Sequence, residues 1–339
     1  MLEKPDLHNE ELIVCLQAEY GLINPQVEFL PLGADQNTAV YRAVTTDEIP
    51  YFVKLRRGSF DPMSVTLPRY LSDQGIHQII APLVTKSGRL WARLGDFAVI
   101  LYPFVEGQDG YEVNLSDHHW VELGQALKRI HSVTLPAAMA GSITREVYPS
   151  HGRETVRKFL GRAQKDTFDE PVAAKLAAFI NTKCRTINDL VNRAERLAQA
   201  LQANAPDFVL CHSDLHAGNI LIDGKQALYI VDWDDPIFAP KERDLMYPGG
   251  NQGFRGHTSR EEEALFYRGY GSVKIDQVAL AYYRYERIVQ DIAIYCEQIF
   301  LSDEGGKDRE QSYRYLTSNF LPNNTIEIAY RSDKTLAAG

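Results

Sequence analysis

Residues 208–235 carry an acid, an amide and a second acid at a spacing that could serve phosphoryl transfer. The pattern H-x-D-x-x-x-x-N runs from His212 through Asp214 to Asn219, and after twelve intervening residues the motif Ile-Val-Asp ends at Asp232. Phosphoryl transfer from ATP passes through a loose transition state, which requires mainly positioning and neutralisation of charge. This set of side chains could supply both.

Each of these side chains has a chemical role that its type allows. Carboxylate and amide oxygens suit Mg²⁺, so Asn219 and Asp232 are the candidate metal ligands. Asp214 is then left to orient a substrate hydroxyl and accept its proton, while His212 holds the loop by hydrogen bonds. Taken singly, each residue is also typical of a turn or a strand end, and only the combination favours phosphoryl transfer.

The flanking segments predict how these residues come together. Residues 208–211 form a short apolar strand, and strands 220–222 and 227–231 flank Asp223-Gly224, a strong hairpin signal. If the hairpin folds about Gly224 and Lys225, Asn219 faces roughly residue 230, and Asp232 lies just beyond the same open end. We therefore expect Asp214, Asn219 and Asp232 to converge.

A lysine upstream fits the same chemistry. Lys54 lies in the apolar segment 51–55, where an unpaired ammonium group would be costly. The α- and β-phosphates of ATP would supply the missing anion, although a lysine that protects an edge strand would look similar. Backbone groups of the next linker could meet the adenine, and a plain interdomain linker is the alternative; its residues are Tyr102, Pro103, Phe104 and Val105.

The chain changes character near residue 105. Strand-like segments occupy 26–31, 38–45, 50–56, 89–94 and 97–103, after a helix at 7–20. Residues 61–75 could form a helix that Pro68 would break or kink. Helical periodicity begins after the N-cap Ser116 and returns at 151–165, 170–203, 260–270 and 275–301. We expect an α+β fold with a β-rich N-terminal lobe, 1–103, a hinge near 102–107, and a mainly helical lobe, 104–339.

Composition restricts the class of protein. The 339 residues are 45% hydrophobic, which suffices for a large core, and the four cysteines form no C-x-x-C pair. The longest uncharged apolar run, 97–105, is too short to span a bilayer. The net charge of −9 disfavours nucleic acid and suits a cationic substrate, as it also suits an ordinary acidic protein. We expect a cytoplasmic monomer that acts on a small molecule.

The motifs H-S-D-L-H-A-G-N, Y-I-V-D-W-D and V-K-L resemble those of the aminoglycoside phosphotransferase and choline kinase superfamily, whose fold is that of the protein kinases. Segments over most of residues 1–330 are similar to the spectinomycin phosphotransferases within it. That resemblance implies ATP- and Mg²⁺-dependent phosphorylation of spectinomycin at hydroxyl nine, and hence antibiotic resistance. It also implies that Asp214 is the base, Asn219 and Asp232 are metal ligands, and Lys54 contacts phosphate.

The sequence departs from the protein kinases at several motifs. The first loop, 31–37, has one glycine in place of G-x-G-x-x-G, and H-S-D and D-W-D replace H-R-D and D-F-G. A protein substrate is therefore disfavoured. The helix 61–75 offers no glutamate to pair with Lys54, so Asp61 is the preferred partner, although a role as N-cap competes with that pairing.

Substrate-binding residues are harder to identify. Spectinomycin carries two secondary amines, so we expect acids near the motifs, and Arg287 and Asp291 could instead pair across one helical turn. The candidates, each of which has a structural charge as its alternative role, are Asp234, Asp235, Glu242, Glu286, Arg287 and Asp291. His131 and His216 are expected to be structural. Two other functions stay open: a kinase for another hydroxylated small molecule, and a non-catalytic nucleotide-binding module.

Overall fold

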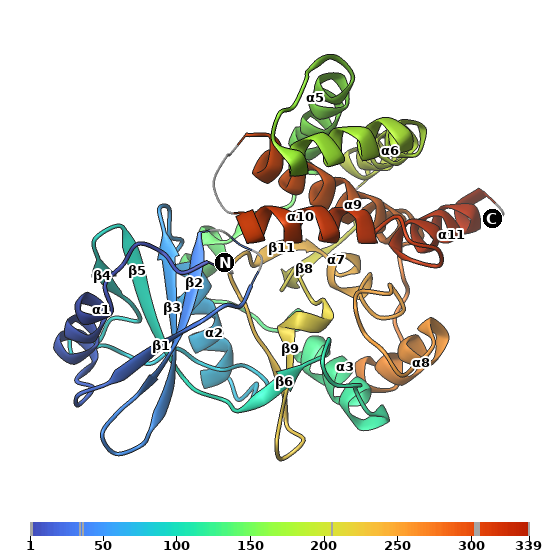
Figure 1. Cartoon of the computed structure of the whole chain (residues 1–339). Coiled ribbons are helices and arrows are strands. Elements are labelled where there is room, and N and C mark those ends of the chain that lie inside the picture. The colour runs from blue at the N-terminus through green and yellow to red at the C-terminus, as the bar shows by residue number, and fades with distance from the viewer. Residues whose placement is uncertain (1–2, 34, 36, 205, 302–305, 338–339) are drawn as a thin grey trace.

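The computed structural model describes residues 3–33, 35, 37–204, 206–301 and 306–337. Its N-terminal part is one antiparallel sheet of order β1-β2-β3-β5-β4 (Figure 1). The strands span Gln26–Leu30 (β1), Thr38–Val44 (β2), Pro50–Arg57 (β3), Ala92–Leu94 (β4) and Phe97–Pro103 (β5). All five agree with the segments that β-branched and aromatic residues predicted, and Lys54 lies on the central strand, paired with Val40 and Ile100.

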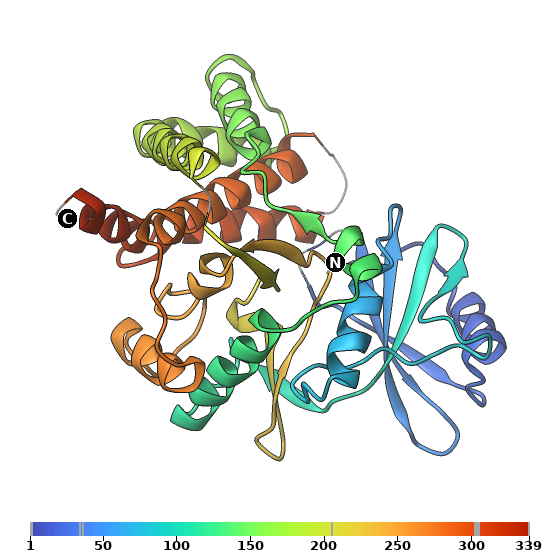
Figure 2. The same cartoon turned by 180° about the vertical axis from the view of Figure 1, so that it is seen from behind.

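Helices cover both faces of this sheet. Helix α1 (Asn9–Cys15) and the π-helical turn η1 (Leu16–Tyr20) bury Leu12 and Leu16 in the same apolar cluster as Tyr41 and Val53 of the sheet. Helix α2 (Met63–Asp73) lies between the sheet and the C-terminal lobe in both views (Figure 2). It runs through Pro68, so the expected break does not occur there.

The C-terminal part is mainly helical, as expected. Its helices are α3 (Asp117–His131), α4 (Ala137–Ser142), α5 (His151–Lys165), α6 (Pro171–Ala203), α7 (Glu242–Leu245), α8 (Ser259–Tyr270), α9 (Gln277–Phe300), α10 (Gly306–Ser318) and α11 (Thr325–Ala337). Sequence periodicity identified the five long helices before α10. It missed α4 and α7, which are short, and α10 and α11, whose pattern was not recognised.

Local chemistry explains where these helices begin. Ser116 caps α3 through a capping box: its side chain accepts from the His119 N–H, and its own N–H donates to His119 Nδ1. Glu170 caps α6 by accepting from the first backbone amides, and Asp276 caps α9 in the same way. Helix α9 is buried along most of its length and therefore forms the centre of the helical lobe.

Two small three-stranded sheets lie among the helices of the C-terminal part. One has the order β10-β9-β6 and the other β7-β11-β8. Their strands span Gly107–Asp109 (β6), Thr144–Arg145 (β7), Phe208–Cys211 (β8), Ile220–Asp223 (β9), Leu228–Ile230 (β10) and Ile237–Pro240 (β11). Within the described part of the chain, none of the helices has the length and hydrophobicity that crossing a bilayer needs.

Candidate active site

The β9–β10 hairpin carries two of the candidate residues at its open end. Leu228 pairs with Ile222, and the Val231 N–H donates to the Asn219 carbonyl at 3.0 Å, so Asn219 faces residue 231. The expected register was therefore wrong by one position. The cause is the turn: the Asp223 carboxylate accepts from the backbone amides of residues 225 and 227, and Gln226 adopts φ 68°, so the loop takes in residue 226 besides the expected Gly224 and Lys225.

A buried acid orders the loop that follows β8. Asp244, on α7, accepts from the His212 N–H at 2.8 Å and from the Ser213 N–H at 2.7 Å. His131 contacts the same carboxylate at 3.0 Å. Burial would raise the pKa of Asp244, but the hydrogen bond and charge of His131 hold it below its usual value. These bonds stabilise the loop although Ser213 has φ 77°, a conformation that non-glycine residues rarely adopt.

His212 makes the hydrogen bonds expected of a loop-holding residue. Its Nδ1 accepts from the Asp214 N–H at 3.2 Å, which leaves Nε2 to donate to the Val231 carbonyl at 2.9 Å. The imidazole therefore joins the loop after β8 to the segment after β10. His216 also holds the loop, since its Nδ1 accepts from the Gly218 N–H at the start of the 3₁₀ turn η2 (Ala217–Asn219), while its Nε2 lies 3.6 Å from Asp214 Oδ2.

Asp214, Asn219 and Asp232 converge at this junction. The Asn219 side-chain amide donates to the Asp214 carbonyl at 2.8 Å, which turns its Oδ1 away from that bond. Asp232 follows directly after the residue that pairs with Asn219, and it adopts φ 65°. The set thus presents an amide oxygen and a carboxylate, which are hard oxygen donors of the kind Mg²⁺ takes, so the residues fit a magnesium ion.

Lys54 reaches this cluster from the N-terminal sheet. Its Nζ lies 2.6 Å from Asp232 Oδ1 and 2.7 Å from Asp234 Oδ1, and the residue is only 8% exposed. Burial opposes the charged forms, but the paired charges raise the pKa of Lys54 and lower that of Asp232 to about 2. Asp61 is therefore not the partner of Lys54: its carboxylate accepts from the Met63 N–H, the first backbone amide of α2, whose N-cap is Pro62.

Asp234 consequently sits with Lys54 rather than in a separate substrate pocket. Its second oxygen lies 2.6 Å from Nη1 of Arg56. Asp235 lines the cavity beside Arg56, and its carbonyl accepts from the Ser213 hydroxyl at 2.8 Å. Sequence reasoning overlooked Arg56, although its position two residues after Lys54 on a strand puts both on one face.

Arg287 is the nearest cation to Asp214. Its Nη1 lies 2.6 Å from Asp214 Oδ1, and the Tyr247 hydroxyl, which lies 2.8 Å from the Ser213 carbonyl, is 3.2 Å from the same carboxylate oxygen. Burial would raise the pKa of Asp214, but Arg287, followed by His216 and His212, holds it below its usual value. The expected pairing of Arg287 with Asp291 is also present, at 3.2 Å.

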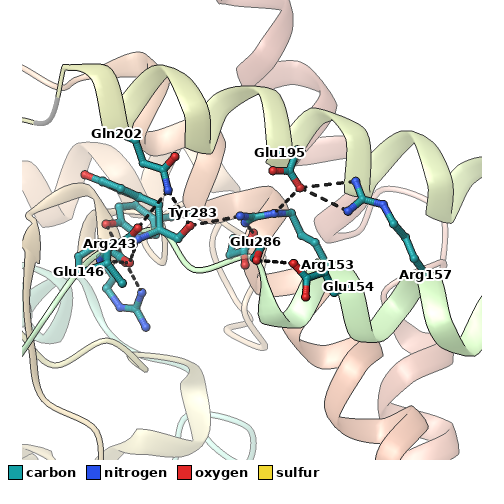
Figure 3. A network of polar contacts seen from close by, with 12 residues as sticks. Glu146, Arg153, Glu154, Arg157, Glu195, Gln202, Arg243, Tyr283 and Glu286 are labelled. Carbon is teal, nitrogen blue, oxygen red and sulfur yellow. Dashed lines mark hydrogen bonds and ion pairs between the residues drawn. The ribbon is translucent and has the colours of Figure 1, made fainter.

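Two of the expected substrate residues lie elsewhere. Glu286 is buried in the polar network that joins α5 and α6 to α9, where Arg153 Nη1 lies 2.6 Å from its carboxylate (Figure 3). Burial raises its pKa to about 7 against the opposing charge of Arg153. Glu242 is fully buried and accepts from the Asp276 N–H at 2.9 Å. Both carboxylates therefore anchor α9 in the interior of the helical lobe, because burial without such partners would be costly.

The linker after β5 borders the cluster. Tyr102 of β5 pairs with Phe52 of the neighbouring strand β3, and the backbone leaves the five-stranded sheet after Pro103. It then enters β6, which pairs with β9 of the hairpin that carries Asn219. Residues 102–107 therefore connect the two parts of the chain beside the site.

Comparisons with known proteins agree with this geometry. The model of the phosphotransferase enzyme family matches residues 28–247. The structure is similar to that of spectinomycin phosphotransferase APH(9)-Ia in complex with ADP and spectinomycin, with a TM-score of 0.89 and 36% identity over 97% of this chain and 99% of that one. Protein StrN of Streptomyces griseus is 26% identical over 227 residues, 65% of this chain and 68% of StrN.

A Plasmodium vivax ethanolamine kinase shares the fold, with a TM-score of 0.63 and 16% identity over 98% of this chain and 93% of that one. The α+β, kinase-like fold and the resemblance inferred from the motifs are thus confirmed, and the reading as a non-catalytic module is not supported. The similar structures include kinases of small molecules. Because the family match spans most of the chain and includes these motifs, this protein belongs to the phosphotransferase enzyme family.

Proposed function

We propose that this enzyme transfers the γ-phosphoryl group of Mg·ATP to a hydroxyl group of spectinomycin, the ring hydroxyl numbered nine. The observation that carries the proposal is the position of the Asp214 carboxylate, held by Arg287 and Tyr247 beside Asn219 and Asp232. The likeness to spectinomycin phosphotransferase over nearly the whole chain supports the choice of substrate.

Residues of both lobes would bind the nucleotide. Lys54 would hold the inner phosphates, Asn219 Oδ1 and Asp232 would hold Mg²⁺, and the backbone of Tyr102, Pro103, Phe104 and Val105 would meet the adenine. When bound, the metal neutralises charge on the phosphoryl group. In this proposal residues 1–103 form the nucleotide-binding lobe, with the hinge near 102–107, and residues 104–339 form the catalytic and substrate-binding lobe, which also supplies the metal ligands.

The acceptor hydroxyl would meet Asp214. Arg287 and Tyr247 both contact Oδ1, whereas Oδ2 has His216 Nε2 at 3.6 Å, beyond hydrogen-bond distance, so we assign Oδ2 to orient the hydroxyl and accept its proton. A pKa below the usual range keeps this carboxylate ionised near neutral pH. The alcohol proton would pass to this carboxylate as the bond from the alcohol oxygen to the γ-phosphorus forms and the bond from that phosphorus to ADP breaks.

Acids and aromatic rings around Asp214 suit a compact dication. Asp291 approaches Arg287 and accepts from Asn319, and Tyr111 stacks on His216 with ring centroids 5.7 Å apart. Carboxylates attract protonated amines, and aromatic faces add cation–π attraction. Asp235 and Asp291 are the substrate acids that we retain. A different hydroxylated amine would use the same catalytic residues and is the alternative substrate.

Steady-state assays with purified protein, Mg·ATP and a panel containing spectinomycin, kanamycin and choline test the proposal. We expect efficient turnover of spectinomycin alone, with the product identified by mass spectrometry and ³¹P NMR, because polar groups left unpaired by a differently shaped ligand make such sites selective. Equal turnover of kanamycin, or none of spectinomycin, would support the alternative substrate. We further propose that the protein works in the cytoplasm, where a reducing environment would keep its four cysteines free. We also expect it to be a monomer.

A further inference from the structure

Arg56 joins the phosphate side of the site from the same strand as Lys54. Alternate residues of a strand project from one face, so both side chains can reach the Asp234 carboxylate. Arg56 Nη1 lies 2.6 Å from Asp234 Oδ2 and 2.8 Å from Asp35 Oδ2, while Lys54 Nζ contacts the other oxygen of Asp234. Asp234 is thus shared by two cations of β3.

The register of the sheet puts Arg56 at the tip of the β1–β2 connection. Arg56 pairs with Thr38, the first residue of β2, and its Nη1 lies 3.1 Å from the Thr38 hydroxyl. In protein kinases the loop between the first two strands covers the nucleotide phosphates. Lys54 pairs with Val40, further from that tip. A phosphate chain that extends from Lys54 toward the loop would therefore meet Arg56 next.

The guanidinium has both donors and space for a ligand. Its hydrogen bonds to described residues all use Nη1, so Nη2 and Nε are available to a further acceptor. A cavity of about 270 Å³, lined also by Ser59 and Asp235, opens beside it, and the Arg56 side chain is 22% exposed. A planar guanidinium anchored at one nitrogen presents the others as a fork that matches phosphate oxygens.

We propose that Arg56 is a second phosphate-binding cation, which contacts the terminal phosphate of a nucleoside triphosphate while Lys54 contacts the inner phosphates. This inference rests on the proposed use of ATP. Asp234 and Asp35 hold the guanidinium through Nη1, so its orientation is set before nucleotide binds. Arg56 would then distinguish triphosphates from diphosphates.

Calorimetric titration of Arg56→Gln with Mg·ADP and with the Mg²⁺ complex of the non-hydrolysable imido analogue of ATP tests this role. We expect affinity for the triphosphate analogue to fall roughly 10- to 100-fold, the loss of a hydrogen bond between charged groups, and affinity for ADP to change by less than about threefold. Arg56→Lys, which keeps the charge but loses the fork, should be intermediate.

Arg57→Gln is the matched control. It removes the same charge from the next position of β3, where the guanidinium lies over the Phe97 ring at 5.2 Å on the other face of the strand. Equal weakening of both nucleotides by Arg56→Gln, or the same selective loss in Arg57→Gln, would overturn the inference. If Arg56→Gln fails to fold, unchanged affinity of Arg56→Lys for the triphosphate analogue would likewise overturn the inference. Wild-type protein that binds neither nucleotide would instead refute the proposed function itself.

Discussion

The Arg287 guanidinium lies 2.6 Å from Oδ1 of Asp214, so a cation from α9 fixes a carboxylate 73 positions earlier in the chain. Arg287→Met removes this contact and leaves that oxygen with the Tyr247 hydroxyl, 3.2 Å away, whose hydrogen the Ser213 carbonyl also attracts at 2.8 Å. Because small misplacements of a reacting group are costly, we expect kcat to fall up to about 100-fold. Nucleotide affinity, measured by calorimetry, should stay near that of the wild type.

Arg284→Met serves as the control for Arg287→Met. Arg284 lies on the same helix but contacts Ser332 and Glu263 instead of Asp214. Its substitution should therefore affect stability more than kcat. A kcat in Arg287→Met equal to that of Arg284→Met would show that the contact with Asp214 has no role in turnover.

Asp214→Asn tests the base itself. An amide cannot accept the hydroxyl proton, so turnover should fall by roughly the 10²–10⁴ that general-base catalysis contributes. Nucleotide affinity should change little, because Lys54 pairs with Asp232 and Asp234 and not with Asp214. Turnover within a few-fold of wild type would remove Asp214 from the chemistry.

Asp232→Ala tests the metal site. The variant loses the carboxylate beside Asn219, and nucleotide should no longer bind more tightly with Mg²⁺ than with EDTA, because the phosphates lose their bridging cation. Titrations with and without the metal measure this difference directly. An unchanged gain in affinity from Mg²⁺ would contradict the role of Asp232.

Asp291→Asn tests the substrate side. Its carboxylate lies beside Arg287 and accepts from Asn319 at 3.3 Å, which an amide oxygen can still do. Loss of a charge that meets a protonated amine should raise the KM for spectinomycin about tenfold or more. Nucleotide affinity should be spared, and an unchanged KM would place the amines elsewhere.

Glu262→Gln tests a buried acid outside the site. Burial raises the pKa of Glu262 to about 7, although its carboxylate accepts from the Gly249 N–H at 3.0 Å. The folded protein therefore holds this proton more tightly than the unfolded chain, and the contribution of Glu262 to stability falls as pH rises from about 4.5 to 7. A glutamine keeps the acceptor but does not ionise.

The free energy of unfolding of Glu262→Gln, relative to that of the wild type, should consequently increase by about 1–2 kcal/mol between pH 5 and pH 8, because the wild type loses stability as Glu262 ionises and the variant does not. Urea unfolding at the two pH values measures this change. Glu112→Gln, the same substitution at an exposed position, is the matched control. A difference independent of pH would mean that Glu262 ionises as readily in the folded protein as in the unfolded chain.

Local patterns were sufficient to predict most of the elements. Helix α5 occupies 151–165 as expected, because apolar residues recur there at helical spacing, and the strands of the N-terminal sheet follow their β-branched segments. The β9–β10 register was missed by one position, since the turn depends on the hydrogen bonds of the Asp223 side chain and the left-handed conformation of Gln226. Neither can be identified from the Asp-Gly pair alone.

The convergence of Asp214, Asn219 and Asp232 could be predicted from the sequence, because a strand, a turn and a second strand bring near neighbours together. Which charges meet across long separations could not, because those contacts depend on how the elements pack. Lys54 pairs with acids 178 and 180 positions away, and Asp244 orders the loop of Ser213. Many acids in the chain have the same chemistry as these, and the packing of α7, α9 and β3 selects among them, because buried charges are stable only beside their partners.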